Sequence, residues 1–185
     1  AADVAAMGTA AITVSNLYQK RISNTMYFSI TAPTPIINSL SPSSASVGSQ
    51  GFTLTVNGSN FLAPSAGTTS SQGSVVRWNG VNRSTTYINS TRLTAVIPAS
   101  DLASAALVDV TVSNEAAGGT VSRASVFTVY NPTPVITSIS PVRILPGSGP
   151  LYLIVNGTGF VSSSVVRFQG SNRSTTLVSS TRLQA

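Results

Sequence analysis

An internal repeat constrains the fold of this chain more than any other feature. Residues 138–160 repeat the pattern of residues 39–61, including the landmark VNGxxF, and residues 165–185 repeat residues 75–95 with 14 of 21 positions identical. Between these blocks the offset falls from 99 to 90 residues, so the first copy has nine additional residues within its Gly-, Ser- and Thr-rich stretch 62–74. Surface loops accept insertions at little cost, so this stretch is predicted to be a loop. A repeat of this length predicts small domains in tandem.

The two ends of the chain align with different portions of the same repeat. Residues 1–16 align with residues 99–114, and residues 26–35 align with residues 125–134. The N-terminal portion therefore closes one repeat, and the C-terminal portion opens another. Together the two portions account for a whole repeat except for the equivalents of Val96, Ile97 and Pro98.

This alignment predicts three domains, of which only the middle one is whole. We expect residues 1–32 to be the C-terminal part of one domain, residues 33–133 to be a complete domain, and residues 134–185 to be the N-terminal part of a further domain. The chain has the character of a segment cut from a longer array.

Apolar and polar side chains alternate with a period of two throughout the middle domain, which predicts β-strands with one face on a core. The apolar members are Ile36, Leu40 and Val47; Phe52, Leu54 and Val56; Val76 and Trp78; Leu93, Ala95 and Ile97; Val108, Val110 and Val112; and Phe127 and Val129. About seven short strands in about 100 residues is typical of an immunoglobulin-like β-sandwich. The predicted fold class is all-β, with tandem Ig-like sandwiches, one complete and two partial.

Helix is expected only at residues 100–103, where Ser100 or Asp101 could cap a single turn between two strands. Alternating prolines mark residues 32–35 and 131–134 as linkers, and such segments favour a stiff, extended backbone. Successive domains are therefore expected to stand end to end as a rod, which keeps the two partial domains of one molecule apart.

These landmarks resemble the IPT/TIG family of immunoglobulin-like domains, in particular the tandem copies of large bacterial secreted or surface proteins. The resemblance is carried by Pro35 with Ile36, the Ser41-Pro42 turn, LTVNGSNF from Leu54, VVRWNG from Val75, TRLTAVIPASDL from Thr91, VDVTVSN from Val108, Gly118-Gly119 and Phe127. It implies an Ig-like fold. The family also occurs in surface receptors, in DNA-binding transcription factors and as accessory modules of carbohydrate-active enzymes, so several functions remain open.

Residue content argues against catalysis. The chain has no histidine or cysteine, which removes the usual bases, nucleophiles and transition-metal ligands. Its four acidic residues are Asp3, Asp101, Asp109 and Glu115, and the first two occupy the same position in successive repeats. The prediction is therefore no enzyme, no catalytic residues, no metal site and no cofactor or cofactor-binding residues, with the binding residues unknown.

Ten basic residues outnumber the acidic ones, and three arginines recur in each repeat. Arg77, Arg83 and Arg92 return as Arg167, Arg173 and Arg182, which would suit a ladder of anion contacts. No lysine cluster or aromatic platform accompanies them, so nucleic acid is not an expected partner. Trp78 alternates with Arg77 and is expected in the core rather than on a sugar-binding surface.

The preferred functional hypothesis is a structural repeat of an extracellular bacterial fibre, stalk or adhesin, located outside the cell or on its surface. Only 8% of the residues are charged, which suits an exported repeat protein. Partial domains would expose strand edges and apolar faces. We expect neighbouring repeats to complete them head to tail, either along a longer covalent chain or between molecules, with surface glycans or other matrix proteins as further partners.

Two other hypotheses stay open: a spacer or carbohydrate-binding accessory module of a secreted enzyme, and a ligand-binding receptor ectodomain that uses the loop at residues 62–74. No apolar run in the sequence is long enough for a membrane helix.

Overall fold

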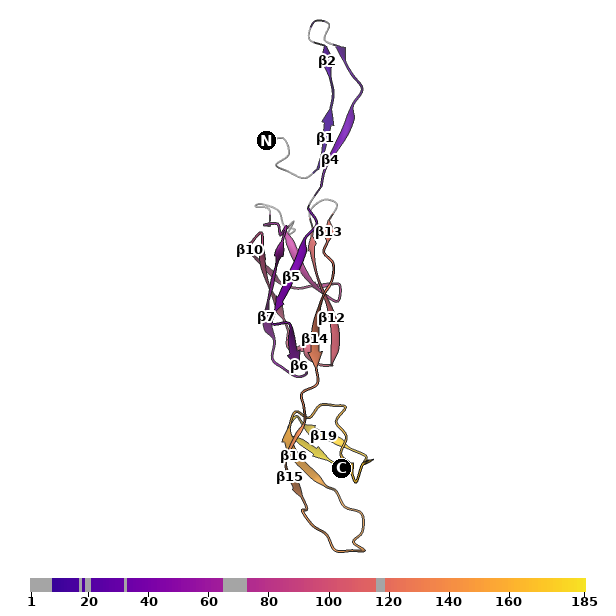
Figure 1. Cartoon of the computed structure of the whole chain (residues 1–185). Coiled ribbons are helices and arrows are strands. Elements are labelled where there is room, and N and C mark those ends of the chain that lie inside the picture. Colours follow the sequence, from indigo (N-terminus) through magenta and orange to yellow (C-terminus); the bar gives the residue numbers. More distant parts are fainter. Residues whose placement is uncertain (1–7, 17, 19–20, 32, 65–72, 116–118) are drawn as a thin grey trace. The chain divides into compact units, whose positions relative to one another are not determined.

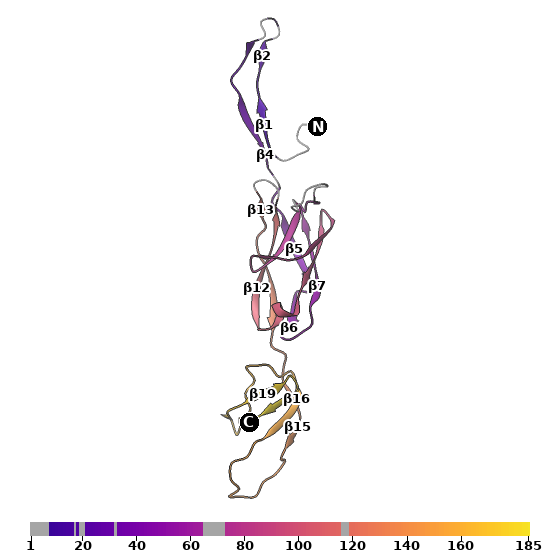
Figure 2. The same cartoon turned by 180° about the vertical axis from the view of Figure 1, so that it is seen from behind.

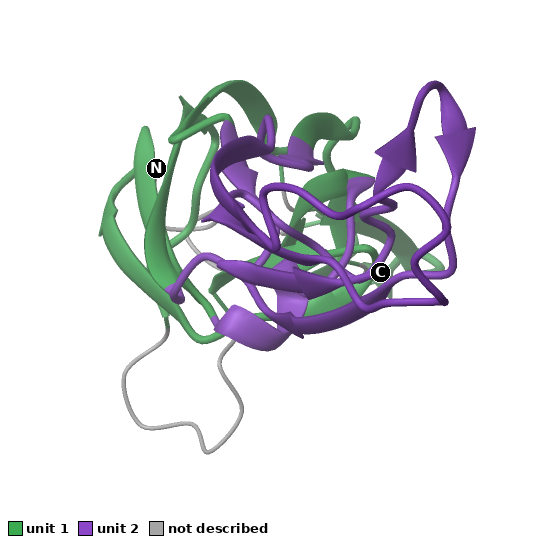
Figure 3. Ribbon diagram, turned by 90° about the horizontal axis from the view of Figure 1, so that it is seen from below, with its two compact units in different colours: residues 1–43, 52–97, 107–127 green, residues 44–51, 98–106, 128–185 purple. Residues whose placement is uncertain are grey.

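A computed structural model describes residues 8–16, 18, 21–31, 33–64, 73–115 and 119–185 of the chain. Asp3, Lys20, Gly118 and residues 65–72 of the predicted loop lie outside the described residues. The chain divides into two compact units, residues 1–43, 52–97 and 107–127 in one and residues 44–51, 98–106 and 128–185 in the other (Figure 3). β-Strands dominate the described part, so the predicted all-β class is confirmed.

Residues 36–130 form two sheets. The first has the order β10-β11-β7-β5, from strands β5 (Ile36–Ser41), β7 (Phe52–Ser59), β10 (Thr85–Asn89) and β11 (Arg92–Ile97), and its strand pairs are antiparallel. The second has the order β6-β14-β12-β8-β9, from strands β6 (Ser44–Ser46), β8 (Ser74–Trp78), β9 (Val81–Asn82), β12 (Ala106–Asn114) and β14 (Ser125–Tyr130), and β13 (Thr120–Val121) also pairs with β12. Figures 1 and 2 show β5, β7 and β10 in one layer and β12 and β13 in the other.

The core between these layers is apolar and is centred on Phe127. The Phe127 ring lies 5.6 Å from that of Phe52 on β7 and 5.0 Å from that of Trp78 on β8, between ring centroids. Aromatic pairs at these spacings add to the free energy gained from burial. Trp78 is only 4% exposed, which confirms its predicted place in the core.

Two local expectations differ from the structure. The single helical turn is the 3-10 helix η2 (Ala99–Leu102), but no side chain caps it, and its N-cap is Pro98, so the predicted cap by Ser100 or Asp101 is wrong. Pro98 can begin the turn because a helix start leaves backbone N–H groups unpaired in any case. Ser74, placed in the loop by its polarity, is instead the buried first residue of β8, because its hydroxyl has hydrogen-bond partners.

The VNGxxF landmark has a steric cause. A Cβ atom at Gly58 would stand 1.9 Å from the Ile36 carbonyl oxygen on β5 and 2.6 Å from the Phe61 ring, distances that real Cβ atoms do not show. Gly157 has the same surroundings, 2.0 Å from the Val135 carbonyl oxygen and 2.6 Å from the Phe160 ring. Only glycine therefore lets the two neighbouring strands and the aromatic ring approach one another so closely.

The remaining strands belong to the N- and C-terminal portions. The N-terminal portion has β1 (Gly8–Ile12) paired with β4 (Met26–Ile30), and β2 (Ser15–Asn16) paired with β3 (Arg21–Ile22). The C-terminal portion has a sheet of order β15-β16-β20-β19, from β15 (Val135–Ser140), β16 (Ile154–Thr158), β19 (Thr176–Ser179) and β20 (Arg182–Gln184), and a separate pair, β17 (Arg167–Phe168) with β18 (Ser171–Asn172). The domain boundaries at residues 32–33 and 133–134 stay predictions.

None of the described segments is a helix of the length and apolar character needed to cross a bilayer.

The close approach at Gly58 predicts that Gly58→Ala destabilises the middle sandwich by about 2 kcal/mol or more, because the added methyl group must push β5 away from β7. Trp78 is the single tryptophan of the chain, so its fluorescence during urea unfolding reports on this sandwich alone. Thr53→Ala, at an exposed position of the same strand, is the matched control and should cost less. An unfolding midpoint for Gly58→Ala equal to that of the control would contradict this account.

Candidate functional site

The described residues bring together no catalytic or metal-binding set. No group of three or more His, Cys, Asp or Glu side chains occurs among them. Glu115 pairs with Arg77 at 3.0 Å between its Oε1 and the guanidinium Nη2, and Asn82 donates to the same carboxylate oxygen at 3.3 Å. This carboxylate is therefore engaged in a contact within its own sandwich.

The recurring arginines also contact their own chain. The Arg77 Nε donates to Asn82, and the Arg92 Nε donates to Asn57 at 3.4 Å. In the second copy, Arg167 donates to the Gly170 carbonyl at 2.8 Å, and the Arg173 guanidinium lies 5.6 Å from the Phe168 ring centroid. These contacts fit side chains that cover a sheet surface better than a ladder of ligand sites.

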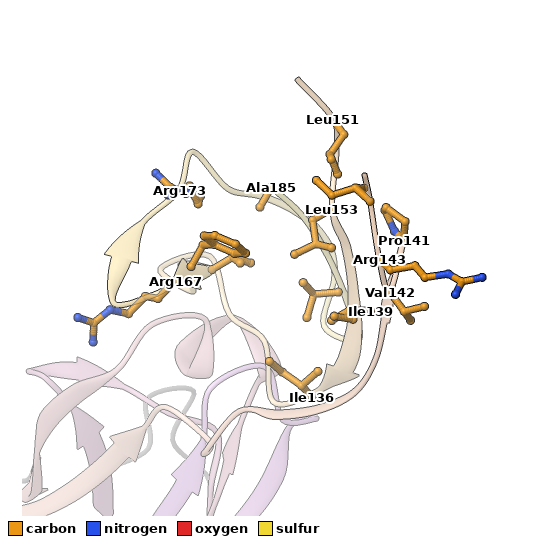
Figure 4. A pocket seen from close by; sticks show the side chains of 14 residues that line it. Ile136, Ile139, Pro141, Val142, Arg143, Leu151, Leu153, Arg167, Arg173 and Ala185 are labelled. Atoms are coloured by element: carbon orange, nitrogen blue, oxygen red, sulfur yellow. The ribbon is translucent and has the colours of Figure 1, made fainter. Parts of the chain in front are cut away.

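The most prominent feature of the C-terminal portion is an apolar groove of about 540 Å³ in residues 135–185. We call it the open core face. Figure 4 shows the side chains of Ile136, Ile139 and Leu153 along one side of it, with the guanidinium groups of Arg143 and Arg167 pointing away. The remaining apolar lining comes from Pro141, Val142, Ile144, Leu151, Val155, Val166, Phe168 and Ala185.

Several residues of the open core face are the repeat equivalents of buried core residues of the middle sandwich. Leu153 and Val166 correspond to Leu54 and Val76, both fully buried. Phe168 corresponds to Trp78, yet it is 54% exposed where Trp78 is 4% exposed. The groove is therefore half of an Ig-like core without its covering layer.

The missing layer can be identified from the strands that the second copy lacks. In the middle sandwich, β8 spans five residues because it pairs with β12, and β6 pairs with β14 in parallel. Its equivalent β17 has only two residues, and no strand forms at the equivalent of β6, around residues 143–145. The short β17 and the missing β6 equivalent have the same explanation: the described C-terminal portion contains no hairpin equivalent to β12–β14.

The N-terminal portion has that hairpin, with its apolar side chains unburied. Ile12, Val14 and Phe28 are 52%, 67% and 55% exposed, whereas their equivalents in β12 and β14 are fully buried: Val110, Val112 and Phe127. Each of these side chains belongs to a residue type whose burial contributes about 1.5–3 kcal/mol. The hairpin and the open core face therefore correspond to the two apolar surfaces that pack on each other in the complete middle sandwich.

A polar contact in the middle sandwich shows how such a hairpin is anchored. The Asn114 Nδ2 on β12 donates to the carbonyl oxygens of Pro33 and Asn60 at 2.8 and 3.0 Å, and the Ser74 hydroxyl donates to Asn114 Oδ1 at 2.5 Å. Asn114 is fully buried and links β8, β12 and the linker before β5. Its repeat equivalent is Asn16, and the equivalent of Ser74 is Ser164.

The sequence predicts partial domains with exposed apolar faces but does not identify binding residues. The repeat offset identifies the residues of the open core face. Adding 90 or 99 to the number of a core residue of the first copy gives its equivalent in the second, and several of those equivalents line the groove: Ile139, Leu153, Val155, Val166, Phe168 and Ala185.

A sequence model of the IPT/TIG domain matches residues 35–129 and 134–185. A search of curated proteins finds no match. Among solved structures, the extracellular region of plexin A4, domains 1 to 10, is similar over 95% of this chain with a TM-score of 0.40 and 18% sequence identity. The chain spans 14% of the length of that plexin region.

The buried Asn114 amide predicts that Asn114→Ala destabilises the middle sandwich by roughly 1–3 kcal/mol, because the change leaves the buried Ser74 hydroxyl without its acceptor and removes a donor from the Asn60 carbonyl. Urea unfolding followed by Trp78 fluorescence measures this change. Glu115→Ala, which removes a half-exposed ion pair on the neighbouring residue, should cost at most about 1 kcal/mol. Equal losses for the two variants would show that the amide does not anchor the hairpin.

Proposed function

Because the chain belongs to the IPT/TIG domain family, we propose that it is a non-enzymatic structural segment of an extracellular bacterial fibre, stalk or adhesin. One observation carries the proposal: the same Ig-like unit recurs along the chain, and its partial copies present complementary halves of one core. Such a segment contributes length and surface, with neighbouring repeats as its partners.

The chemistry of the surface supports a location outside the cell. Few residues are charged and none is cysteine, while Ser, Thr and Asn occupy most polar strand positions. Folding in an oxidising environment therefore requires no thiol protection, and the neutral hydroxyl-rich faces suit a long array exposed to solvent.

A second candidate is ligand binding by a receptor ectodomain. A pocket of about 340 Å³ lies beside the end of the loop that is unique to the first copy, lined among others by Pro64, Gly73, Arg83 and Tyr87. This location favours recognition because loops on a rigid sandwich commonly carry binding residues. The third possibility, a carbohydrate-binding spacer in a secreted enzyme, would use the same surface or an exposed aromatic.

Immunolabelling tests the structural proposal. Antibodies raised against the folded chain should label intact source cells or their shed material without permeabilisation, and immunogold should follow extended structures in electron micrographs. Labelling only after permeabilisation would overturn the proposed location.

Removal of residues 65–72 separates the structural from the recognition hypothesis. We expect the shortened chain to keep its free energy of unfolding in urea within about 0.5 kcal/mol, because surface loops contribute little to stability. A glycan array and a pull-down from the source matrix, each run with both chains, provide the functional comparison. Binding by the intact chain that the shortened chain lacks would favour recognition over scaffolding.

A further inference from the structure

We infer that the open core face binds a hairpin of the type formed by residues 8–30, in the position that β12–β14 occupy in the middle sandwich, and that a second copy of the 185-residue chain can supply this hairpin. This inference rests on the proposed structural function and names its partner, surface and strand register. The contact would complete one Ig-like domain from two chains by the addition of strands to a sheet edge.

The receiving half already has the strand register of a complete domain. Val155 pairs with Leu183 as Val56 pairs with Leu93, and Arg167 pairs with Asn172 as Arg77 pairs with Asn82. Side-chain hydrogen bonds repeat as well: the Val166 N–H donates to Thr175 Oγ1 at 3.0 Å, the same distance as from Val76 to Thr85. The changes that a second layer requires are the extension of β17 and the formation of a strand near residues 143–145.

The hairpin is also already in its bound form. Ser15 pairs with Ile22 in the same way as Ser113 pairs with Val121. The Val14 N–H donates to Ser23 Oγ at 2.9 Å, as the Val112 N–H donates to Ser122 Oγ at 2.9 Å. Both serine hydroxyls then donate to the carbonyl of the next residue at 2.8 Å. Pre-organised partners lose less conformational entropy on binding.

The middle sandwich defines the register of the contact. There Val110 is opposite Trp78, and Val112 is opposite Val76. In the assembled pair, Ile12 of the second copy would lie opposite Phe168, and Val14 would lie opposite Val166. A slip of one residue would turn these apolar side chains toward solvent, so the register is strongly specified.

Phe28 takes the central place in this arrangement. Its equivalent Phe127 packs between Phe52 and Trp78, whose own equivalents are Leu151 and Phe168 on the open core face. Phe28 is 55% exposed in the hairpin, and both Leu151 and Phe168 line the groove. The aromatic side chain and the groove therefore match in position as well as in chemistry.

Polar groups match at the edge of the groove. Asn16 would reach Ser164 as Asn114 reaches Ser74, and Ser164 already accepts the Val161 N–H at 2.9 Å, as Ser74 accepts that of Leu62 at 2.8 Å. Leu17 stands where the first complete copy has Glu115, so no equivalent of the Arg77–Glu115 ion pair can form. Apolar burial would hold the pair together, and high salt should not separate it.

The 185-residue chain has one hairpin and one open core face, so a contact between two such chains is heterologous: different surfaces meet, and further chains can add to it. The competing occupant is a strand hairpin supplied by residues that follow Ala185 in a longer chain. A second molecule of the 185-residue chain and such an extension would compete for the same groove.

Cysteine cross-linking tests the register. Thr13 and Arg167 are equivalent to Thr111 and Arg77, which are Cα partners across β12 and β8, and the chain has no cysteine of its own. Mixed under mild oxidation, Thr13→Cys and Arg167→Cys chains should form a disulfide-linked dimer in high yield. Thr13→Cys mixed with Ser179→Cys, placed on β19, is the matched control and should give at least about tenfold less dimer.

Light scattering tests whether the same surfaces drive association in solution. The unmodified chain should have an average mass that rises with concentration and is unchanged in 1 M NaCl, whereas Phe28→Asp should remain monomeric. Trp78 fluorescence should show the same urea midpoint for both chains, which establishes that the middle sandwich of the variant still folds.

Three results would overturn the inference. The first is a monomeric chain at all concentrations. The second is a disulfide that forms within a Thr13→Cys/Arg167→Cys double variant but not between mixed single variants. The third is loss of association in a chain extended past Ala185 by its own reading frame. None of them bears on surface labelling, so the proposed structural function is tested independently.

Discussion

Coverage of an apolar sheet face by a second layer is the constraint on which this structure depends. A single twisted sheet with one apolar face is not stable in water, and a second sheet has to pack on it. In residues 36–130 this occurs where Phe127 packs against Phe52 and Trp78. The Asn114 amide supports the same contact from the rim, because it joins β12 to β8 and to the linker.

The C-terminal and N-terminal portions keep the internal order of a complete domain without this coverage. Their strand registers and side-chain hydrogen bonds repeat those of the middle sandwich, while Phe168 and Phe28 are exposed. Local pairing and glycine sterics, such as the close approach at Gly157, are therefore sufficient to define each half. The packing of one sheet on the other joins two such half-domains. In a fibre, this packing would occur when neighbouring repeats assemble.

The repeat and the period-two pattern predict most of the fold, because both depend on side-chain polarity that is visible in the sequence. Trp78 is an example: its neighbours alternate, and it is buried. The position of Ser74 was not predicted because the partners of its buried hydroxyl come from tertiary contacts. The start of η2 at Pro98 differs, because the fixed backbone of proline is a local property. Exposed apolar faces at the two partial domains were also expected from the repeat. The groove itself could not be predicted, because it depends on which repeat equivalents of core residues have no second sheet packed on them.

Hydrogen–deuterium exchange at low and high protein concentration tests most directly whether the two halves complete one another. Amide groups of residues 12–16 and 164–168 should exchange quickly in dilute solution and become protected together as concentration rises, because new strand pairs enclose them. Fast exchange of both segments at every concentration, with residues 108–112 protected throughout, would contradict the account.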